Sequence, residues 1–154
     1  MDLVLVGSDK GNLKYVLGLA NTLGLEEQVH FLGFVTREEL ISLYQGAFAL
    51  TYLSLFGPEN IPPLEAFKFG CPVITANYNG AREQGGEAAL YVNGLDPDAI
   101  AQAIRELHDR PDFRLSLINK GSERAGQYNG GSYIWDVFKI FDEFEAVRRN
   151  WGSM

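Results

Sequence analysis

Residues 56–65 combine the residue types from which a binding site for a phosphate and a sugar could be built. Gly57 lets a ligand approach the backbone closely. A helix beginning near Pro62 would present unpaired N–H groups and its dipole to an anion such as a phosphate. Glu65, about one helical turn further on, could accept hydrogen bonds from two hydroxyls of a ribose or hexose, which suits a nucleotide or sugar nucleotide. From the spacing alone, an ordinary proline-started helix with a solvated Glu65 is an equal alternative.

Other residues with chemical potential have simpler explanations. Asp96 and Asp98 imitate an Asp-x-Asp metal motif, but an Asp before Pro at a helix start is typical of an N-cap, so no metal is predicted. His30 lies inside an apolar run and is interpreted as a structural histidine. Cys71 is the single cysteine, which excludes a disulfide framework and favours an inert core thiol. No cofactor is expected.

Composition limits the class of protein. The 154 residues correspond to one domain or part of a larger one, and 46% of them are hydrophobic, enough for a packed core. The net charge of −7 disfavours nucleic-acid binding, because phosphate backbones need a cationic surface. No apolar run reaches the roughly 18 residues that span a bilayer. We therefore expect a soluble, cytoplasmic protein. Trp151 beside Arg148 and Arg149 suggests that it could lie at the inner face of the membrane.

Strands and helices are expected to alternate along the chain. The apolar patterns predict strands at residues 3–6, 29–35, 48–53, 71–76 and 88–92. They predict helices near 13–23, 36–47, 62–70, 97–107, 112–128 and 133–149. Such alternation indicates an α/β fold, a parallel sheet flanked by helices. Ligands of these sheets bind beyond the carboxyl ends of the strands, so we expect the loops after Val6, Val35, Leu53 and Ala76 to form the site.

Several ordered segments resemble one family. Residues 57–67 (GPENIPPLEAF) and 70–74 (GCPVI) resemble the donor-site signature of family-4 retaining glycosyltransferases of the GT-B fold. Residues 29–35 (VHFLGFV), 43–47 (LYQGA) and 79–90 (NGAREQGGEAAL) resemble further blocks of the same family, in the same order. The resemblance extends over residues 3–107 and implies a Rossmann-like donor-binding domain.

The resemblance also implies roles for individual residues. Glu65 matches the glutamate that holds the nucleotide ribose. Ile61 and Pro62 match the helix start that faces the donor diphosphate, and Phe34 and Val35 match the segment whose backbone lies against the base. The implied partner is therefore a nucleotide diphosphate sugar, which is a substrate rather than a cofactor.

The sequence departs from the family pattern at two places. The first glutamate of the family's pair falls on Gly57, so Glu59 or Asn60 would replace its contact to the donor sugar, or backbone groups alone would make it. The chain also begins at what resembles the second strand of the donor domain. The acceptor domain, the basic diphosphate clamp and the catalytic histidine of many relatives have no match, although Lys10, Lys14 and Arg82 could supply positive charge.

We therefore interpret residues 1–154 as a single partial domain: the C-terminal GT-B domain, truncated at its N-terminus. The implied enzyme transfers a hexose from a nucleotide sugar to a saccharide or lipid-linked acceptor in polysaccharide biosynthesis. The fragment alone is expected to be inactive and to carry no certain catalytic residue. The alternative is a non-catalytic nucleotide-binding or interaction module. A sugar-nucleotide epimerase or a flavodoxin-like domain is a weaker third interpretation.

A missing first strand would have a structural consequence. In a sheet ordered 3-2-1-4-5-6 the absent strand is the central one, so its two neighbours would expose apolar edges. We expect the chain either to pair the strand at 3–6 with the strand at 48–53, or to recruit another chain by self-association through these edges.

Overall fold

The computed structural model describes residues 1–56, 60–128 and 130–151. The chain divides into two compact units, Met1–Leu43 and Tyr44–Met154, called here the N-terminal and the C-terminal unit. The boundary falls within helix α2 (Arg37–Gly46), so the last turn of this helix belongs to the C-terminal unit.

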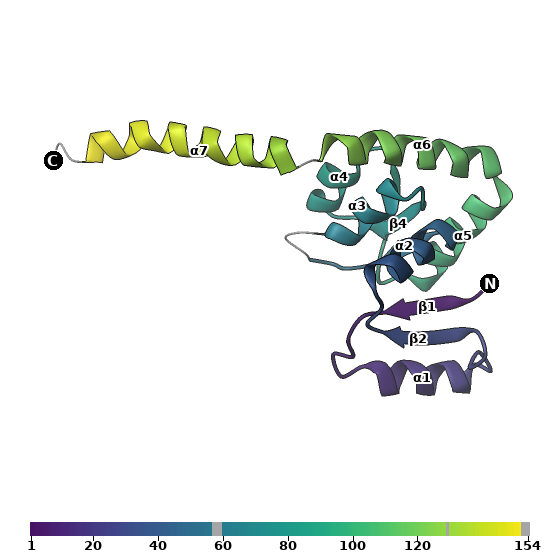
Figure 1. The fold of residues 1–154 in the computed structure, drawn as a ribbon. Coiled ribbons are helices and arrows are strands. Elements are labelled where there is room, and N and C mark those ends of the chain that lie inside the picture. Colours follow the sequence, from purple (N-terminus) through teal and green to yellow (C-terminus); the bar gives the residue numbers. More distant parts are fainter. Residues whose placement is uncertain (57–59, 129, 152–154) are drawn as a thin grey trace. The chain divides into compact units, whose positions relative to one another are not determined.

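The N-terminal unit is a parallel strand–helix–strand motif. Strand β1 (Leu3–Val6) pairs in parallel with β2 (Val29–Gly33), and α1 (Leu13–Thr22) connects them along one face of the pair (Figure 1). Ala20 is the buried residue of α1. The side chains of β1 remain largely exposed, so this small unit buries little of its apolar surface.

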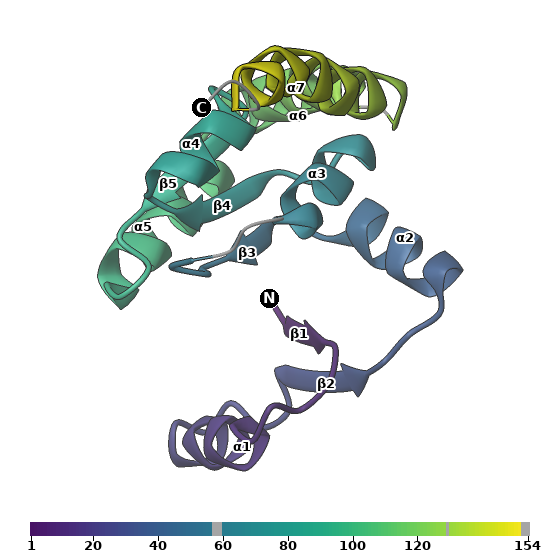
Figure 2. The same cartoon turned by 90° about the vertical axis from the view of Figure 1, so that its left-hand side faces the viewer.

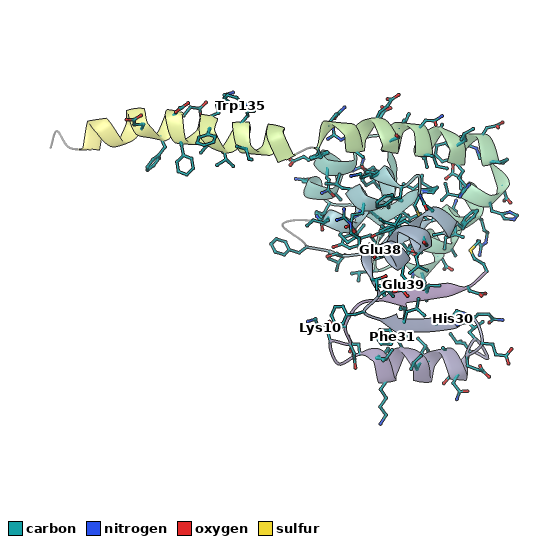
Figure 3. The ribbon with its side chains drawn as sticks, in the orientation of Figure 1. Lys10, His30, Phe31, Glu38, Glu39 and Trp135 are labelled. Carbon is teal, nitrogen blue, oxygen red and sulfur yellow. The ribbon has the colours of Figure 1, made fainter. Side chains whose placement is uncertain are left out.

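A capping box stabilises the start of α2. The Thr36 N–H donates to Glu39 Oε2 at 2.7 Å, and the Glu39 N–H donates to Thr36 Oγ1 at 3.2 Å. These two bonds satisfy two donors that a helix start otherwise leaves open. They also lower the pKa of the Glu39 carboxyl, mainly through the bond from the Thr36 backbone. Glu39 and its exposed neighbour Glu38 are labelled in Figure 3.

The C-terminal unit contains a second parallel sheet, of order β3-β4-β5. The strands are β3 (Leu50–Tyr52), β4 (Val73–Ala76) and β5 (Ala89–Val92), connected by α3 (Ile61–Lys68) and α4 (Asn79–Gly85). All four residues of β4 are buried, as expected for a central strand covered on both faces. Figure 2 shows α3 and α4 on one side of this sheet and the next helix, α5, on the other.

Three helices follow the last strand: α5 (Pro97–Asp109), α6 (Pro111–Gln127) and α7 (Gly130–Trp151). The core is a cluster of Ile74, Val92, Ala103, Leu107 and Leu117, contributed by β4, β5, α5 and α6. Asp96 caps α5 as predicted, because its Oδ1 accepts hydrogen bonds from the N–H groups of Asp98 and Ala99 at 3.0 and 3.2 Å. In the described residues, no helix combines the length and the apolar character needed to span a membrane.

The α/β fold with parallel sheets flanked by helices is confirmed. Of the two alternatives expected for the open strand edges, pairing of the first strand with the third does not occur within the described residues, and association with another chain stays a prediction. In the described residues β1 pairs with β2 and β3 pairs with β4, in two separate sheets. Each pairing is maintained by its own helical crossover, a local constraint that leaves the other edges of β1 and β3 without a partner strand. The segment after β4, predicted as a loop with one turn, forms α4.

Candidate functional site

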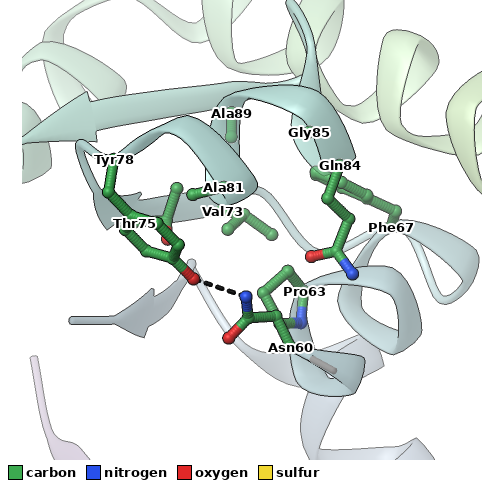
Figure 4. Close-up of a pocket in the computed structure, with 10 residues that line it drawn as sticks. All are labelled: Asn60, Pro63, Phe67, Val73, Thr75, Tyr78, Ala81, Gln84, Gly85 and Ala89. Carbon is green, nitrogen blue, oxygen red and sulfur yellow. Dashed lines mark hydrogen bonds between the residues drawn. The ribbon is translucent and has the colours of Figure 1, made fainter. Parts of the chain in front are cut away.

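Asn60 sets the geometry at the start of α3. It adopts the left-handed backbone conformation with φ 37°, which Asn tolerates better than most residues, and its side chain is 8% exposed. Its Nδ2 donates a hydrogen bond to the hydroxyl of Tyr78, which lies in the segment after β4 (Figure 4). The chain after β3 and the chain after β4 are thereby joined at the carboxyl ends of neighbouring strands.

The helix start offers fewer amide donors than a typical anion site. Four N–H positions at a helix start lack a partner within the helix. Two of these positions in α3 are Pro62 and Pro63, which carry no N–H and cannot donate to an anion. Ile61 is 50% exposed and Pro62 is partly buried. A phosphate here would depend mainly on the amide of Ile61 and on the helix dipole.

Glu65 lies partly buried on α3, where it meets a tyrosine. The Tyr44 hydroxyl, in the last turn of α2, donates to Glu65 Oε2 at 3.2 Å. The Tyr44 ring is 8% exposed and stacks on Phe69, with ring centroids 6.1 Å apart. Burial, reinforced by the charge of Glu65, raises the pKa of Tyr44 well above its ordinary value of 10.0, so the hydroxyl stays protonated and remains a donor.

A cation lies at the same edge of the C-terminal sheet. Arg82, on α4, donates from Nε to the side-chain oxygen of Asn77 at 2.6 Å, and Asn77 directly follows β4. Its guanidinium also lies 4.5 Å from the centroid of the Tyr91 ring. These contacts hold a positive charge beside the carboxyl end of β4, where a diphosphate would benefit from it.

The remaining predicted site residues lie in different places. Phe34 and Val35 belong to the N-terminal unit, between β2 and α2; the Phe34 side chain is 84% exposed and Val35 is partly buried. Gly57 and Glu59 lie outside the described residues, so their roles stay predictions. The C-terminal unit thus brings together Asn60, Ile61, Pro62 and Glu65, and adds Tyr44 and Tyr78.

The two tyrosines had no predicted role. Tyr44 was part of a recognisable block, LYQGA, but the pattern alone did not connect it with Glu65, 21 residues away. Tyr78 gave no signal, because its partner Asn60 is on a different loop. Both contacts depend on packing between segments far apart in the sequence.

The cavity behind the helix start is too small for a nucleotide. It has a volume of about 10 Å³, space for about one water, and is lined by residues such as Asn60, Pro63, Phe67, Thr75 and Tyr78 (Figure 4). It is therefore a packing gap beneath the Asn60–Tyr78 contact. A nucleotide would have to bind on the more open side of the helix start, where Ile61 is exposed.

The other candidate residues have structural surroundings. His30 Nε2 lies 3.4 Å from Asp2 Oδ2 on the surface of the N-terminal unit (Figure 3). Cys71 is buried, and burial raises the pKa of its thiol to about 11, which confirms an inert core cysteine. Within the described ranges, no cluster of His, Cys, Asp and Glu could hold a metal ion.

Residues 1–124 match the sequence model of a protein family, the glycosyl transferases group 1. This chain belongs to that family. A curated relative, the O-antigen chain mannosyltransferase RfbU of Salmonella typhimurium, is 35% identical over 144 residues, which are 92% of this chain and 36% of the relative. The chain spans about a third of the length of the curated relatives it matches.

Solved structures confirm the GT-B type of fold. Sucrose-phosphate synthase from Thermosynechococcus elongatus superimposes with a TM-score of 0.80 at 25% identity, covering 95% of this chain and 39% of that chain. HepE of Anabaena, solved in complex with UDP and glucose, also gives a TM-score of 0.80, at 22% identity, covering 92% of this chain and 40% of that chain. Both likenesses cover part of a longer chain.

Proposed function

We propose that this chain is the donor-nucleotide-binding part of a retaining, family-4 glycosyltransferase. The whole enzyme would transfer a hexose from a nucleotide diphosphate sugar to a saccharide or lipid-linked acceptor. The observation that carries the proposal is the partly buried carboxylate of Glu65, which accepts a hydrogen bond from Tyr44 and lies one turn inside a helix that follows the carboxyl end of β3. Family membership and the UDP complex of HepE support a nucleotide donor.

The chemistry follows from the charges at this edge of the sheet. The Glu65 carboxylate would accept hydrogen bonds from the two ribose hydroxyls. It would repel a phosphate, which is also negatively charged and has no proton to donate. The start of α3 near Ile61 and the cation of Arg82 would stabilise the negative charge of the departing diphosphate. Phe34 and Val35 would contact the base, while Glu59, Asn60 or the backbone at Gly57 would contact the sugar.

Titration calorimetry tests the assignment of Glu65. We expect the 154-residue chain to bind UDP or GDP, and Glu65→Ala to weaken that binding by about ten- to a hundredfold, because hydrogen bonds to a charged carboxylate are lost. Glu123→Ala, at an exposed site on α6, is the matched control and should bind as the parent does. Equal binding by Glu65→Ala and the parent would remove Glu65 from the ribose role.

Turnover separates this proposal from the non-catalytic alternative. The matched parts are 30% and 36% of the lengths of two curated relatives, so the whole enzyme would have groups outside this chain to complete its site. We expect the 154-residue chain to bind nucleotide without releasing sugar from UDP-glucose or GDP-mannose. Sugar release by a longer protein containing this chain would support the enzyme; its absence there would favour the binding module. The acceptor and a cytoplasmic location stay proposals.

A further inference from the structure

The Glu65 side chain has a single anchor. In the described residues, the hydrogen bond from Tyr44 is the one that its carboxylate accepts. A glutamate on a helix surface otherwise samples several rotamers, and ordering it on binding costs free energy that a prearranged side chain avoids. The position of the carboxylate therefore depends on how firmly Tyr44 is itself held.

Tyr44 is a rigid support. Its ring is buried and stacked nearly parallel to Phe69, with 17° between the ring planes, and it projects from the last turn of α2. Burial and the neighbouring carboxylate raise the pKa of Tyr44, so its hydroxyl stays protonated at neutral pH and can donate to Glu65.

We propose that Tyr44 is a positioning residue: its hydroxyl holds the Glu65 carboxylate in the orientation that receives the two ribose hydroxyls of the donor. This inference rests on the proposed function. An ionised carboxylate has about four acceptor positions, and Tyr44 occupies one of them on Oε2. Oε1 and the remaining capacity of Oε2 are enough for both hydroxyls of a vicinal diol.

The test compares nucleotides with and without the ribose hydroxyls. Tyr44→Phe removes the hydroxyl and keeps the ring that stacks on Phe69. By calorimetry we expect it to weaken binding of UDP or GDP by about three- to tenfold, and to leave binding of the corresponding 2′,3′-dideoxynucleotide unchanged. In the Glu65→Ala background, Tyr44→Phe should cause no further loss, because the carboxylate it orients is gone.

Tyr91→Phe is the matched control. Tyr91 is a half-buried tyrosine whose hydroxyl donates to the backbone oxygen of Gly86 at 2.7 Å, so the variant loses a comparable hydrogen bond at a distance from Glu65 in the sequence and in the hydrogen-bond network. It should lower the melting temperature without changing the ratio of the UDP and dideoxy-UDP affinities. If Tyr44→Phe fails to fold, Phe69→Leu replaces it, because this variant removes the ring on which Tyr44 stacks and keeps the Tyr44 hydroxyl. It should also lower the affinity for UDP relative to that for dideoxy-UDP.

Each outcome decides the question. Normal UDP and GDP binding by Tyr44→Phe, with weakened binding by Glu65→Ala, would overturn the positioning role and leave the proposed function standing. If Tyr44→Phe weakens the binding of UDP and of dideoxy-UDP equally, Tyr44 has only a structural role. The same conclusion follows if Tyr44→Phe weakens UDP binding just as much when Glu65 is already Ala. Unchanged binding by Glu65→Ala, or no binding by the parent, would overturn the proposed function together with this inference.

Discussion

At the scale of the residue, the unusual backbone of Asn60 is the feature that shapes the helix start. Its positive φ is a conformation that glycine and asparagine adopt more readily than other residues, and its amide ties the segment after β3 to Tyr78. Asn60 therefore has two separate roles: it adopts the left-handed backbone conformation, and its side chain donates a hydrogen bond to Tyr78. Substitutions can separate them.

Variants of Asn60 should differ in stability according to which of these two roles they retain. Asn60→Gly keeps the left-handed conformation but loses the hydrogen bond, so we expect a loss of about 0.5–1.5 kcal/mol in the free energy of unfolding, similar to that of Tyr78→Phe. Asn60→Ala should lose about 1 kcal/mol more, because of the strained backbone. Urea denaturation measures all three. Identical stability of the Ala and Gly variants would contradict the role of the backbone.

At the scale of the element, the close contact between α3 and α6 determines where α3 lies. A methyl group added at Gly121 of α6 would lie 2.8 Å from Cδ1 of Phe67, a fully buried ring of α3. Gly121 thus permits an approach of the two helices that no larger residue allows. Because Glu65 is on the same short helix as Phe67, the packing of α6 also determines the position of the site.

Two glycines on one helix give a matched pair of variants. Gly121→Ala should destabilise the protein by about 1–3 kcal/mol, since overpacking outweighs the gain in helix propensity. Gly126→Ala, also on α6, has nothing within 4 Å of the added methyl and should be neutral or stabilising by up to about 1 kcal/mol. Thermal and urea unfolding compare them. A Gly121→Ala variant as stable as Gly126→Ala would show that the helices can separate without cost.

At the scale of the whole molecule, the chain has two small sheets in place of one. In the described residues, the edges of β1 and β3 that face away from their partners have no strand beside them. Three of the four side chains of β1 are exposed and apolar, namely Leu3, Val4 and Val6. Each of these open edges is a template on which another strand could pair.

Self-association of the chain stays a prediction, and the edge of β1 allows a sharp test. The N–H groups of Leu3 and Gly7 donate to the β2 side, so alternation along the strand directs the N–H of Val4 to the unpaired edge. We expect concentration-dependent association in sedimentation velocity, abolished by Val4→Pro and retained by Val4→Ala. A parent that stays monomeric at all concentrations would contradict edge pairing.

The elements and the family follow from local sequence. Some signals involve only residues close together in the sequence, so they can be interpreted without the tertiary structure. They are the apolar periodicity, the capping box at Thr36, the cap at Asp96 and the block at residues 57–67. This is why the strand and helix order and the glycosyl transferase family were predicted, with errors mainly at the ends of elements and in the helical segment α4.

Long-range packing accounts for the features that the sequence pattern did not reveal. Tyr44 reaches Glu65 from 21 residues away, and Asn60 meets Tyr78 across two loops. The separation of the strands into two sheets has the same origin, because strand pairing depends on which edges meet in space. Residue type and spacing predicted Glu65 as an acceptor for sugar hydroxyls. Its hydrogen bond from a buried tyrosine depends on how the helices pack, since side-chain orientation depends on neighbours that the linear order does not specify.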